Sequence, residues 1–250
     1  MKDINSQPES NIVVGRNAVA ELLKSGRTVD KILIKDGTWE GSIKEIAALA
    51  RQMHVPLVTC GKSKLDYVAQ GASHQGVIAV VPEIEYSSVE EILDHASMLG
   101  EKPFICIADG INDPHNLGAL IRCAEAAGCH GLIIPKRRSV TLNATVVKSS
   151  AGAAMHLRVA RVTNLASAID FLKKKGIWIY AAEADGQNYS ECRIITPAAF
   201  VFGSEGDGVS RLVKEKCDFV LSIPMKGKVN SLNVSSAAAV ILFYAGGYFG

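Results

Sequence analysis

The sequence lacks the features that define several common classes of protein. No apolar run reaches the roughly 18 residues that a membrane-spanning helix needs. Residues 1–10 are polar and contain no apolar signal-peptide core, so we expect a flexible tail there. These absences predict a cytoplasmic protein without a membrane partner.

Metal-binding and disulfide patterns are missing too. The six cysteines form no Cys-x-x-Cys pair and accompany no histidine cluster, which predicts reduced thiols and no bound metal. Neither a Walker loop nor a Gly-x-Gly-x-x-Gly fingerprint is present, so a dinucleotide cofactor is not supported. Because the net charge is only +2, a nucleic-acid partner would have to be bound by local basic groups. The candidates are Arg16, residues 136–138, Lys148, Lys226 and Lys228.

What is present predicts two domains. With 250 residues, 48% of them hydrophobic, the chain can bury a large core and is long for a single domain. Short apolar strands and amphipathic helices alternate in residues 11–82, which predicts a small α/β domain. Residues 83–101 carry an acidic helical pattern between prolines, a composition typical of a linker.

Residues 102–250 predict a doubly wound parallel sheet. Their strands are short, continuous apolar runs, as expected where helices cover both faces of a sheet. The expected strands are 104–108, 131–135, 177–182, 199–202 and 219–223, and the expected helices are 116–127, 142–154, 165–175, 209–216 and 234–244. Ligands of such sheets bind beyond the carboxyl ends of the strands.

Two of these strand ends carry residues suited to chemistry. After the first strand, Arg122 stands among apolar neighbours, so it either forms an ion pair or binds a phosphate or carboxylate. After the fourth strand, Gly203, Gly206 and Gly208 allow tight turns around Glu205. Each segment alone is only weakly specific.

The segment from Ile223 to Ala239 forms a third such strand end. Pro224 ends the strand because it has no N–H for a sheet ladder. Ser231 and Asn233 are of the types that cap helices, and an apolar helix follows from Val234. A helix N-terminus beside a strand end attracts anionic or polar ligand groups. The alternative is an ordinary strand–turn–helix corner.

The three segments, in this order, resemble a known family. Residues 109–122 read Asp-Gly-x-x-Asp-Pro-x-Asn-x-Gly-Ala-x-x-Arg, residues 202–208 read Phe-Gly-Ser-Glu-Gly-x-Gly, and residues 223–235 read Ile-Pro-Met-x-Gly-x-Val-x-Ser-Leu-Asn-Val-Ser. They are similar to the SpoU (TrmH) branch of the SPOUT RNA methyltransferases. The amino-terminal part, with Val-Gly-Arg-Asn-Ala-Val and His-Gln-Gly-Val-Ile-Ala, looks like the substrate-binding domain of RlmB-type ribosomal RNA guanosine 2′-O-methyltransferases. Many relatives have His where this chain has Asn17.

The resemblance implies a carboxyl-terminal trefoil knot that binds S-adenosyl-L-methionine, and a homodimer with the active site at its interface. The family's catalytic positions fall on Asn116, Arg122, Glu205, Ser231 and Asn233. Its adenosine contacts fall on Gly203, Ile223 and Leu232, and Met225 would help to frame an apolar adenine slot.

The implied function is 2′-O-methylation of a guanosine in large-subunit (23S) ribosomal RNA. Transfer RNA is the alternative substrate. A non-catalytic RNA-binding factor for ribosome assembly and a nucleotide-dependent oxidoreductase are the alternative classes. We favour Glu205 or a water as the acceptor of the hydroxyl proton, with Arg122 holding an RNA phosphate, because a guanidinium hardly deprotonates.

Overall fold

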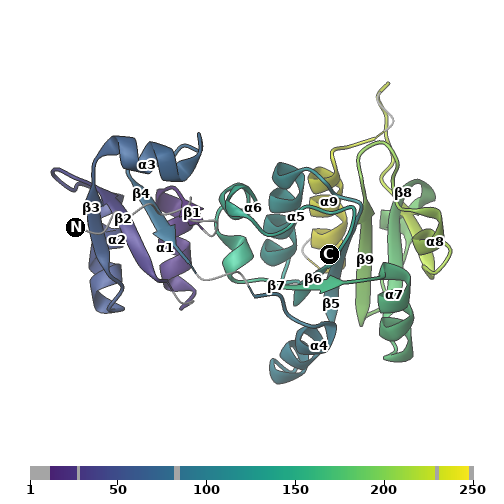
Figure 1. Cartoon of the computed structure of the whole chain (residues 1–250). Coiled ribbons are helices and arrows are strands. Elements are labelled where there is room, and N and C mark those ends of the chain that lie inside the picture. Colours follow the sequence, from purple (N-terminus) through teal and green to yellow (C-terminus); the bar gives the residue numbers. More distant parts are fainter. Residues whose placement is uncertain (1–11, 27–28, 82–84, 229–230, 248–250) are drawn as a thin grey trace. The chain divides into compact units, whose positions relative to one another are not determined.

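The structure is a computed structural model of the whole chain and describes residues 12–26, 29–81, 85–228 and 231–247 (Figure 1). Its contacts divide the chain into two compact units. The first unit comprises Met1–Glu85 and Leu142–His156, and the second comprises Tyr86–Thr141 and Leu157–Gly250. The tail predicted at residues 1–10 lies outside the described residues.

The second unit is built on a parallel sheet. Its strands lie in the order β10-β8-β9-β5-β6-β7, and every neighbouring pair is parallel. This confirms the predicted α/β class. The strands are β5 (Phe104–Asp109), β6 (Gly131–Pro135), β7 (Arg158–Val162), β8 (Trp178–Asn188), β9 (Ala198–Gly203) and β10 (Phe219–Ser222).

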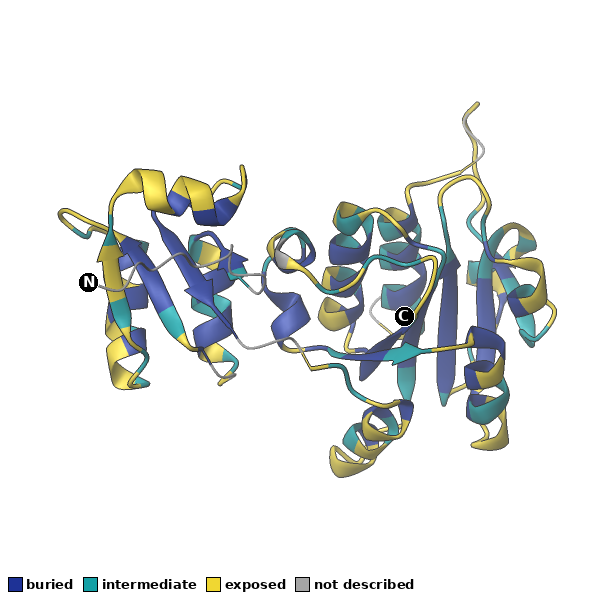
Figure 2. Ribbon diagram, viewed as in Figure 1, coloured by how far each residue is buried: buried dark blue, intermediate teal, exposed yellow. Residues whose placement is uncertain are grey.

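Helices cover both faces of this sheet, which explains why its central strands are apolar throughout. Side chains that alternate along β5 point to opposite faces, and both Ile105 and Cys106 are fully buried. One face packs against α4 (Val89–Met98), α7 (Leu165–Lys174) and the short α8 (Arg211–Lys214). The other packs against α5 (Pro114–Ala126) and α9 (Val234–Ala245), which also contact each other. Figure 2 shows the central strands buried.

Residues 12–81 of the first unit form a small α/β layer, and the same unit also includes Leu142–His156. Its four-stranded sheet has the order β1-β4-β2-β3, in which only β2 and β3 run parallel. The strands are β1 (Ile12–Val14), β2 (Lys31–Lys35), β3 (Leu57–Cys60) and β4 (Val77–Val80). The helices in residues 12–81 are α1 (Arg16–Lys24), α2 (Ser42–Gln52) and α3 (Lys62–Ala69).

Residues 142–154 differ from the single helix expected there. Helix α6 (Ala144–Ser149) is short, and a 3-10 turn (Ala153–Met155) follows it. The helix ends here because Ala151, directly after its C-cap Ser150, has a positive φ of 52°, and Gly152 follows with φ of 94°. The edge strand β7 then follows, and it was not predicted. Its sequence, Arg-Val-Ala-Arg-Val, is interrupted by two arginines and is not the continuous apolar run of a central strand.

The segment expected to link the domains contains a helix of the second unit. Ser88 and Glu91 cap α4 reciprocally: the Glu91 N–H donates to Ser88 Oγ (3.1 Å), and the Ser88 N–H donates to Glu91 Oε2 (2.7 Å). Val89 and Ile92 are buried in the core beneath the sheet. The acidic residues of this helix therefore occupy its outer face, while its apolar face is packed.

The winding of the second sheet reverses at its centre. Strands β5 and β9 are neighbours, with Asp109 opposite Gly203 at their carboxyl ends. From β5 the chain builds outward through β6 and β7 on one side, and β8 and β10 lie beyond β9 on the other. A crevice beyond the strand ends is expected at such a reversal. Among the described residues, no helix is both long and apolar enough to span a bilayer.

The packing of α4 can be tested by truncating its buried side chain. Ile92 is fully buried, so Ile92→Ala should lower the free energy of unfolding by about 2–5 kcal/mol in urea titrations. Met98, in the same helix, is 74% exposed, and Met98→Ala should change the stability little. Equal, small losses in both variants would show that α4 is only a linker.

Candidate functional site

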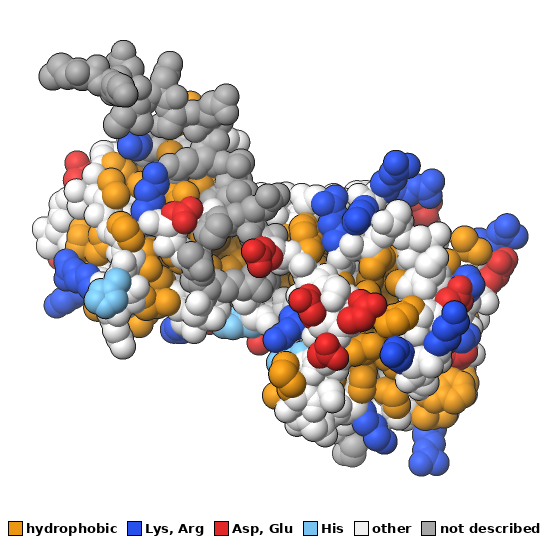
Figure 3. Space-filling model, turned by 60° about the horizontal axis from the view of Figure 1, so that its bottom comes forward, with side chains coloured by type: hydrophobic (Ala, Val, Ile, Leu, Met, Phe, Trp, Pro, Cys, Tyr) orange, Lys and Arg blue, Asp and Glu red, His pale blue; other side chains and the backbone are white. Residues whose placement is uncertain are grey.

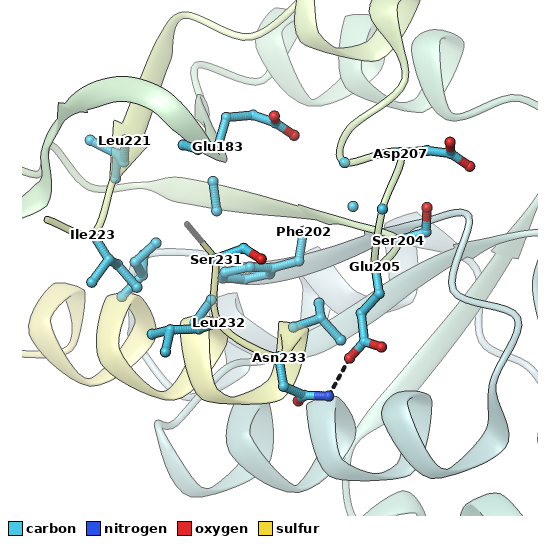
Figure 4. A pocket seen from close by; sticks show the side chains of 18 of the residues that line it. Glu183, Phe202, Ser204, Glu205, Asp207, Leu221, Ile223, Ser231, Leu232 and Asn233 are labelled. Atoms are coloured by element: carbon cyan, nitrogen blue, oxygen red, sulfur yellow. Dashed lines mark hydrogen bonds between the residues drawn. The ribbon is translucent and has the colours of Figure 1, made fainter. Parts of the chain in front are cut away.

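A cavity of about 690 Å³ opens at the carboxyl ends of β9 and β10, beside residues 182–184 of β8, and at the N-terminus of α9 (Figure 4). Seven of the predicted site residues line it: Gly203, Glu205, Ile223, Met225, Ser231, Leu232 and Asn233. The strand ends that the sequence singled out around Glu205 and Asn233 therefore meet in one place.

A close approach of two backbone segments shapes one wall. A Cβ on Gly203 would lie 1.9 Å from the carbonyl carbon of Gly208, which no side chain can do. Ser204 and Gly208 exchange backbone hydrogen bonds of 3.2 and 3.0 Å across the intervening turn. Gly206, at the tip, has φ of 97°, a conformation that favours glycine. The glycines thus fold the loop back on itself and present Glu205 beside the cavity.

Asn233 joins three separate segments through its side-chain amide. Its Oδ1 accepts hydrogen bonds from the N–H (2.9 Å) and the Oγ (2.6 Å) of Ser235. Through these bonds Asn233 caps α9. Since that N–H can only donate, the orientation of the amide is fixed. Its Nδ2 then donates to Asn116 Oδ1 (3.0 Å) and to Glu205 Oε1. Figure 4 shows the contact with Glu205. Asn116 does not line the cavity but is linked to it in this way.

Arg122 does not reach the cavity and is not part of the core. It is exposed on α5, while Leu120, Ile121 and Ala124 are buried. Its sequence neighbours are apolar, but in a helix they point to other sides. Within the described parts of the chain, it forms no hydrogen bond or ion pair. The buried ion pair considered as one of its roles is therefore absent from this part of the chain.

The sequence analysis missed Glu183, a further carboxylate in the wall. Residues 182–186 leave the ladder between β8 and β10, whose register shifts between Val220 and Leu221. One oxygen of Glu183 accepts a hydrogen bond from the Val209 N–H and lies close to Gly208. The available signal was its position directly after the apolar run 177–182, another strand end at the same edge of the sheet.

The composition of the lining limits what the cavity can bind. Its charged side chains are the carboxylates Glu183, Glu205 and Asp207, and no described lining residue is Lys, Arg or His. Leu232 and Met225 lie 40% and 38% exposed at the wall, so a ligand would cover apolar surface. Such a site suits a ligand with a flat apolar part and a cationic group. It does not suit a ligand rich in phosphate, contrary to the anionic preference considered for this corner.

Among the described residues, no group of three or more His, Cys, Asp or Glu side chains is arranged to hold an ion.

Comparison with known families agrees with this geometry. The family described as SpoU rRNA Methylase matches residues 103–243, more than half of the chain. The chain belongs to this SpoU family. A second family, described as RNA 2′-O ribose methyltransferase substrate binding, matches residues 12–87. The resemblance drawn from the three motifs is confirmed, and the chain is an RNA methyltransferase by family.

Individual relatives in the SpoU family align with nearly the whole length of this chain. A Staphylococcus haemolyticus protein named as a TrmH family tRNA/rRNA methyltransferase is 46% identical over 94% of both chains. YacO of Bacillus subtilis, named in the same way, is 42% identical over 94% of both chains. Among solved structures, the SpoU methyltransferase AviRb of Streptomyces viridochromogenes, in complex with AdoMet, is similar with a TM-score of 0.79. At 23% identity over 96% of this chain and 91% of that one, AviRb supports the fold.

Substitution of Asn233 should separate its two roles. Asn233→Ala removes the cap of α9 and should lower the free energy of unfolding by about 1 kcal/mol. Asn233→Ser keeps a capping oxygen and should restore most of that stability. Both variants lose the amide that holds Glu205, so amide hydrogen exchange in residues 203–208 should be faster in both. Unchanged exchange in both variants would show that the loop of residues 203–208 keeps its conformation without the contact between Asn233 and Glu205.

Proposed function

We propose that this protein transfers the methyl group of S-adenosyl-L-methionine to the ribose 2′-hydroxyl of a guanosine in large-subunit (23S) ribosomal RNA. The observation that carries the proposal is the acidic and apolar cavity at the strand ends, with the linked side chains of Asn116, Asn233 and Glu205 beside it. Family membership supports the reaction class.

The cavity fits S-adenosyl-L-methionine, which would supply an electrophilic methyl group on a cationic sulfonium. Ile223, Leu232 and Met225 would hold the adenine against apolar surface, with backbone groups at Gly203, Ile223 and Leu232 within the same lining. The carboxylates of the wall would favour the ligand's positive charge. These residues would act mainly by alignment, which can supply about 7–11 kcal/mol of a barrier.

The hydroxyl proton needs an acceptor, and Glu205 is the carboxylate placed for it. Glu205 is exposed and is oriented by the amide of Asn233, so it can take the proton directly or through a water. Ser231 also lines the cavity and offers a hydroxyl to position the ribose. Arg122 would hold an RNA phosphate rather than act as the base, because a guanidinium keeps its proton. Its lack of a carboxylate partner among the described residues supports this role.

The RNA must be bound by local basic groups. In Figure 3, Lys and Arg side chains are interspersed with Asp and Glu on the face drawn, as a net charge of +2 suggests. The matched substrate-binding family in residues 12–87 supports RNA selection by the first unit. Ribosomal RNA is our proposed substrate; transfer RNA is the alternative, since the relatives are named for both. The homodimer and the trefoil knot are proposed from the family resemblance.

Ligand binding separates the methyltransferase from the oxidoreductase alternative. S-adenosylhomocysteine at 100 times its Kd should stabilise the protein by about 2.7 kcal/mol and raise its melting temperature, whereas NADPH should not. A shift with NADPH alone would refute the cofactor assignment. Comparing ribose methylation in ribosomal and transfer RNA from cells with and without the protein would then identify the substrate. An unchanged methylation pattern in both RNAs would favour the non-catalytic assembly factor.

Arg122→Ala should lower turnover by about two orders of magnitude or more, equivalent to about 1.4 kcal/mol of transition-state stabilisation per tenfold. The melting temperature and cofactor affinity should hardly change, because Arg122 is exposed and does not line the cavity. Arg122→Lys should restore little, since an ammonium cannot replace the planar fork. Arg211→Ala, at a side chain 90% exposed on α8, is the matched control and should keep full turnover. A loss of activity that only follows a loss of folded protein would contradict the assignment.

A further inference from the structure

The first unit contains a second cavity, of about 990 Å³, that the proposed chemistry does not use. Its lining comes from five parts of the unit: the start of α1, the end of β2 with the loop after it, the start of α2, helix α3, and the loop of residues 71–76 before β4. The cavity therefore belongs to the first unit alone. Both an aromatic ring and several cationic side chains line it.

Buried His74 fixes the loop that forms one wall. Its Nδ1 accepts a hydrogen bond from the Gly76 N–H (3.0 Å), so the proton of the neutral ring lies on Nε2, which donates to Asp66 Oδ1 (3.0 Å). Gln75 and Gly76 have φ of 52° and 87°, and this pairing holds them in that conformation. Because both ring nitrogens of His74 already form hydrogen bonds within the protein, His74 stabilises the wall of the cavity, and other residues would contact a ligand.

Trp39 offers its ring rather than its N–H. The indole Nε1 donates to the Lys35 carbonyl oxygen (3.0 Å), so its only polar group is already satisfied. The guanidinium carbon of Arg51 lies 5.8 Å from the ring centroid and helps to hold the ring, and Arg51 itself does not line the cavity. Trp39 is half-buried and faces the cavity with apolar surface.

Cationic groups surround this ring. The Nε of Arg16 donates to the Gln75 carbonyl oxygen (2.9 Å), which orients the guanidinium, and its terminal nitrogens have no partner among the described residues. Lys35 and Lys62 also line the cavity and form no ion pair within the described chain. Two carboxylates, Asp36 and Asp66, also line the cavity, and Asp66 keeps its charge while it accepts the hydrogen bond from His74. The three cations therefore exceed the carboxylates by one.

We propose that this cavity binds one unpaired nucleotide of RNA, with its base stacked on Trp39 and an adjoining phosphate on Arg16 and Lys62. An aromatic ring among phosphate-binding cations is the usual arrangement for recognising unpaired bases, whereas a duplex keeps its bases stacked on each other. This inference rests on the proposed function in that the substrate is RNA. It adds that the first unit selects an RNA with an unpaired base rather than a continuous helix.

The fluorescence of Trp39 tests the stack directly. The chain has two tryptophans, and Trp178 lies in the second unit, so the full-length Trp178→Phe variant reports on Trp39 alone. An RNA hairpin with an unpaired loop should quench this fluorescence on binding, and a blunt duplex of the same composition should quench it much less. Quenching by both RNAs equally, or by neither while the hairpin binds, would overturn the proposal.

The affinity of the full-length protein for the RNA hairpin provides the second test, with Trp178 left in place. Trp39→Ala should weaken hairpin binding about five- to 150-fold, the range for loss of one stacked base, and Trp39→Phe should keep most of it. Tyr67→Ala, at a 63% exposed ring that does not line the cavity, is the matched control and should bind normally. S-adenosylhomocysteine should bind all variants alike.

The outcomes distinguish this inference from the proposed function. Hairpin binding that is unaffected by Trp39→Ala, in a protein that still methylates RNA, would refute only the stacking site. Absence of binding to both RNAs would refute both proposals. If Trp39→Ala lowers the melting temperature, the fluorescence experiment and Trp39→Phe still decide, because both keep an aromatic ring at this position.

Discussion

The amide of Asn233 is the contact on which the arrangement of the site depends. Its two acceptor and two donor interactions are all made within the protein, to Ser235, Asn116 and Glu205. One side chain thereby starts helix α9 and ties it to the beginning of α5 and to the glycine loop after β9. A serine or aspartate could cap the helix, but only an amide can accept at one end and donate twice at the other. The need for an amide at position 233 therefore determines both the start of α9 and the position of Glu205 beside the cavity.

The cavity of the site differs in charge from the cavity of the first unit. The described lining of its cavity contains carboxylates and apolar side chains but no cation. Cations without a partner among the described residues include Arg122 on α5 and, around the cavity of the first unit, Lys35 and Lys62. A cationic cofactor and a polyanionic substrate can therefore be attracted to separate surfaces, although the net charge of the chain is close to zero.

The sequence predicted what depends on short-range pattern. Continuous apolar runs located the five strands β5, β6, β8, β9 and β10, and the glycine, asparagine and serine types at their ends predicted the loops that meet in the cavity. Edge strand β7 was not predicted because its two arginines interrupt the apolar run. Its position at the edge of the sheet explains why a strand can carry them. Arg122 and Glu183 show the same limit. The direction of the Arg122 side chain depends on how α5 packs, and the bulge that carries Glu183 depends on the pairing of β8 with β10. Both involve segments that are distant in the sequence.

Residues 142–156 complete the first unit although they lie in the middle of the chain. They fit it closely: a Cβ on Gly152 would lie 2.5 Å from that of Glu21, and His156 Nε2 lies 3.4 Å from Glu21 Oε2. A ribosome adds residues in order, so the amino-terminal unit stays unfinished until residue 156 has emerged. By then β5 and β6 of the other unit have already been made. The first unit can therefore be completed only after part of the second has been synthesised. A graft that exchanges only the first 85 residues would also replace Glu21 while leaving Gly152 and His156 behind.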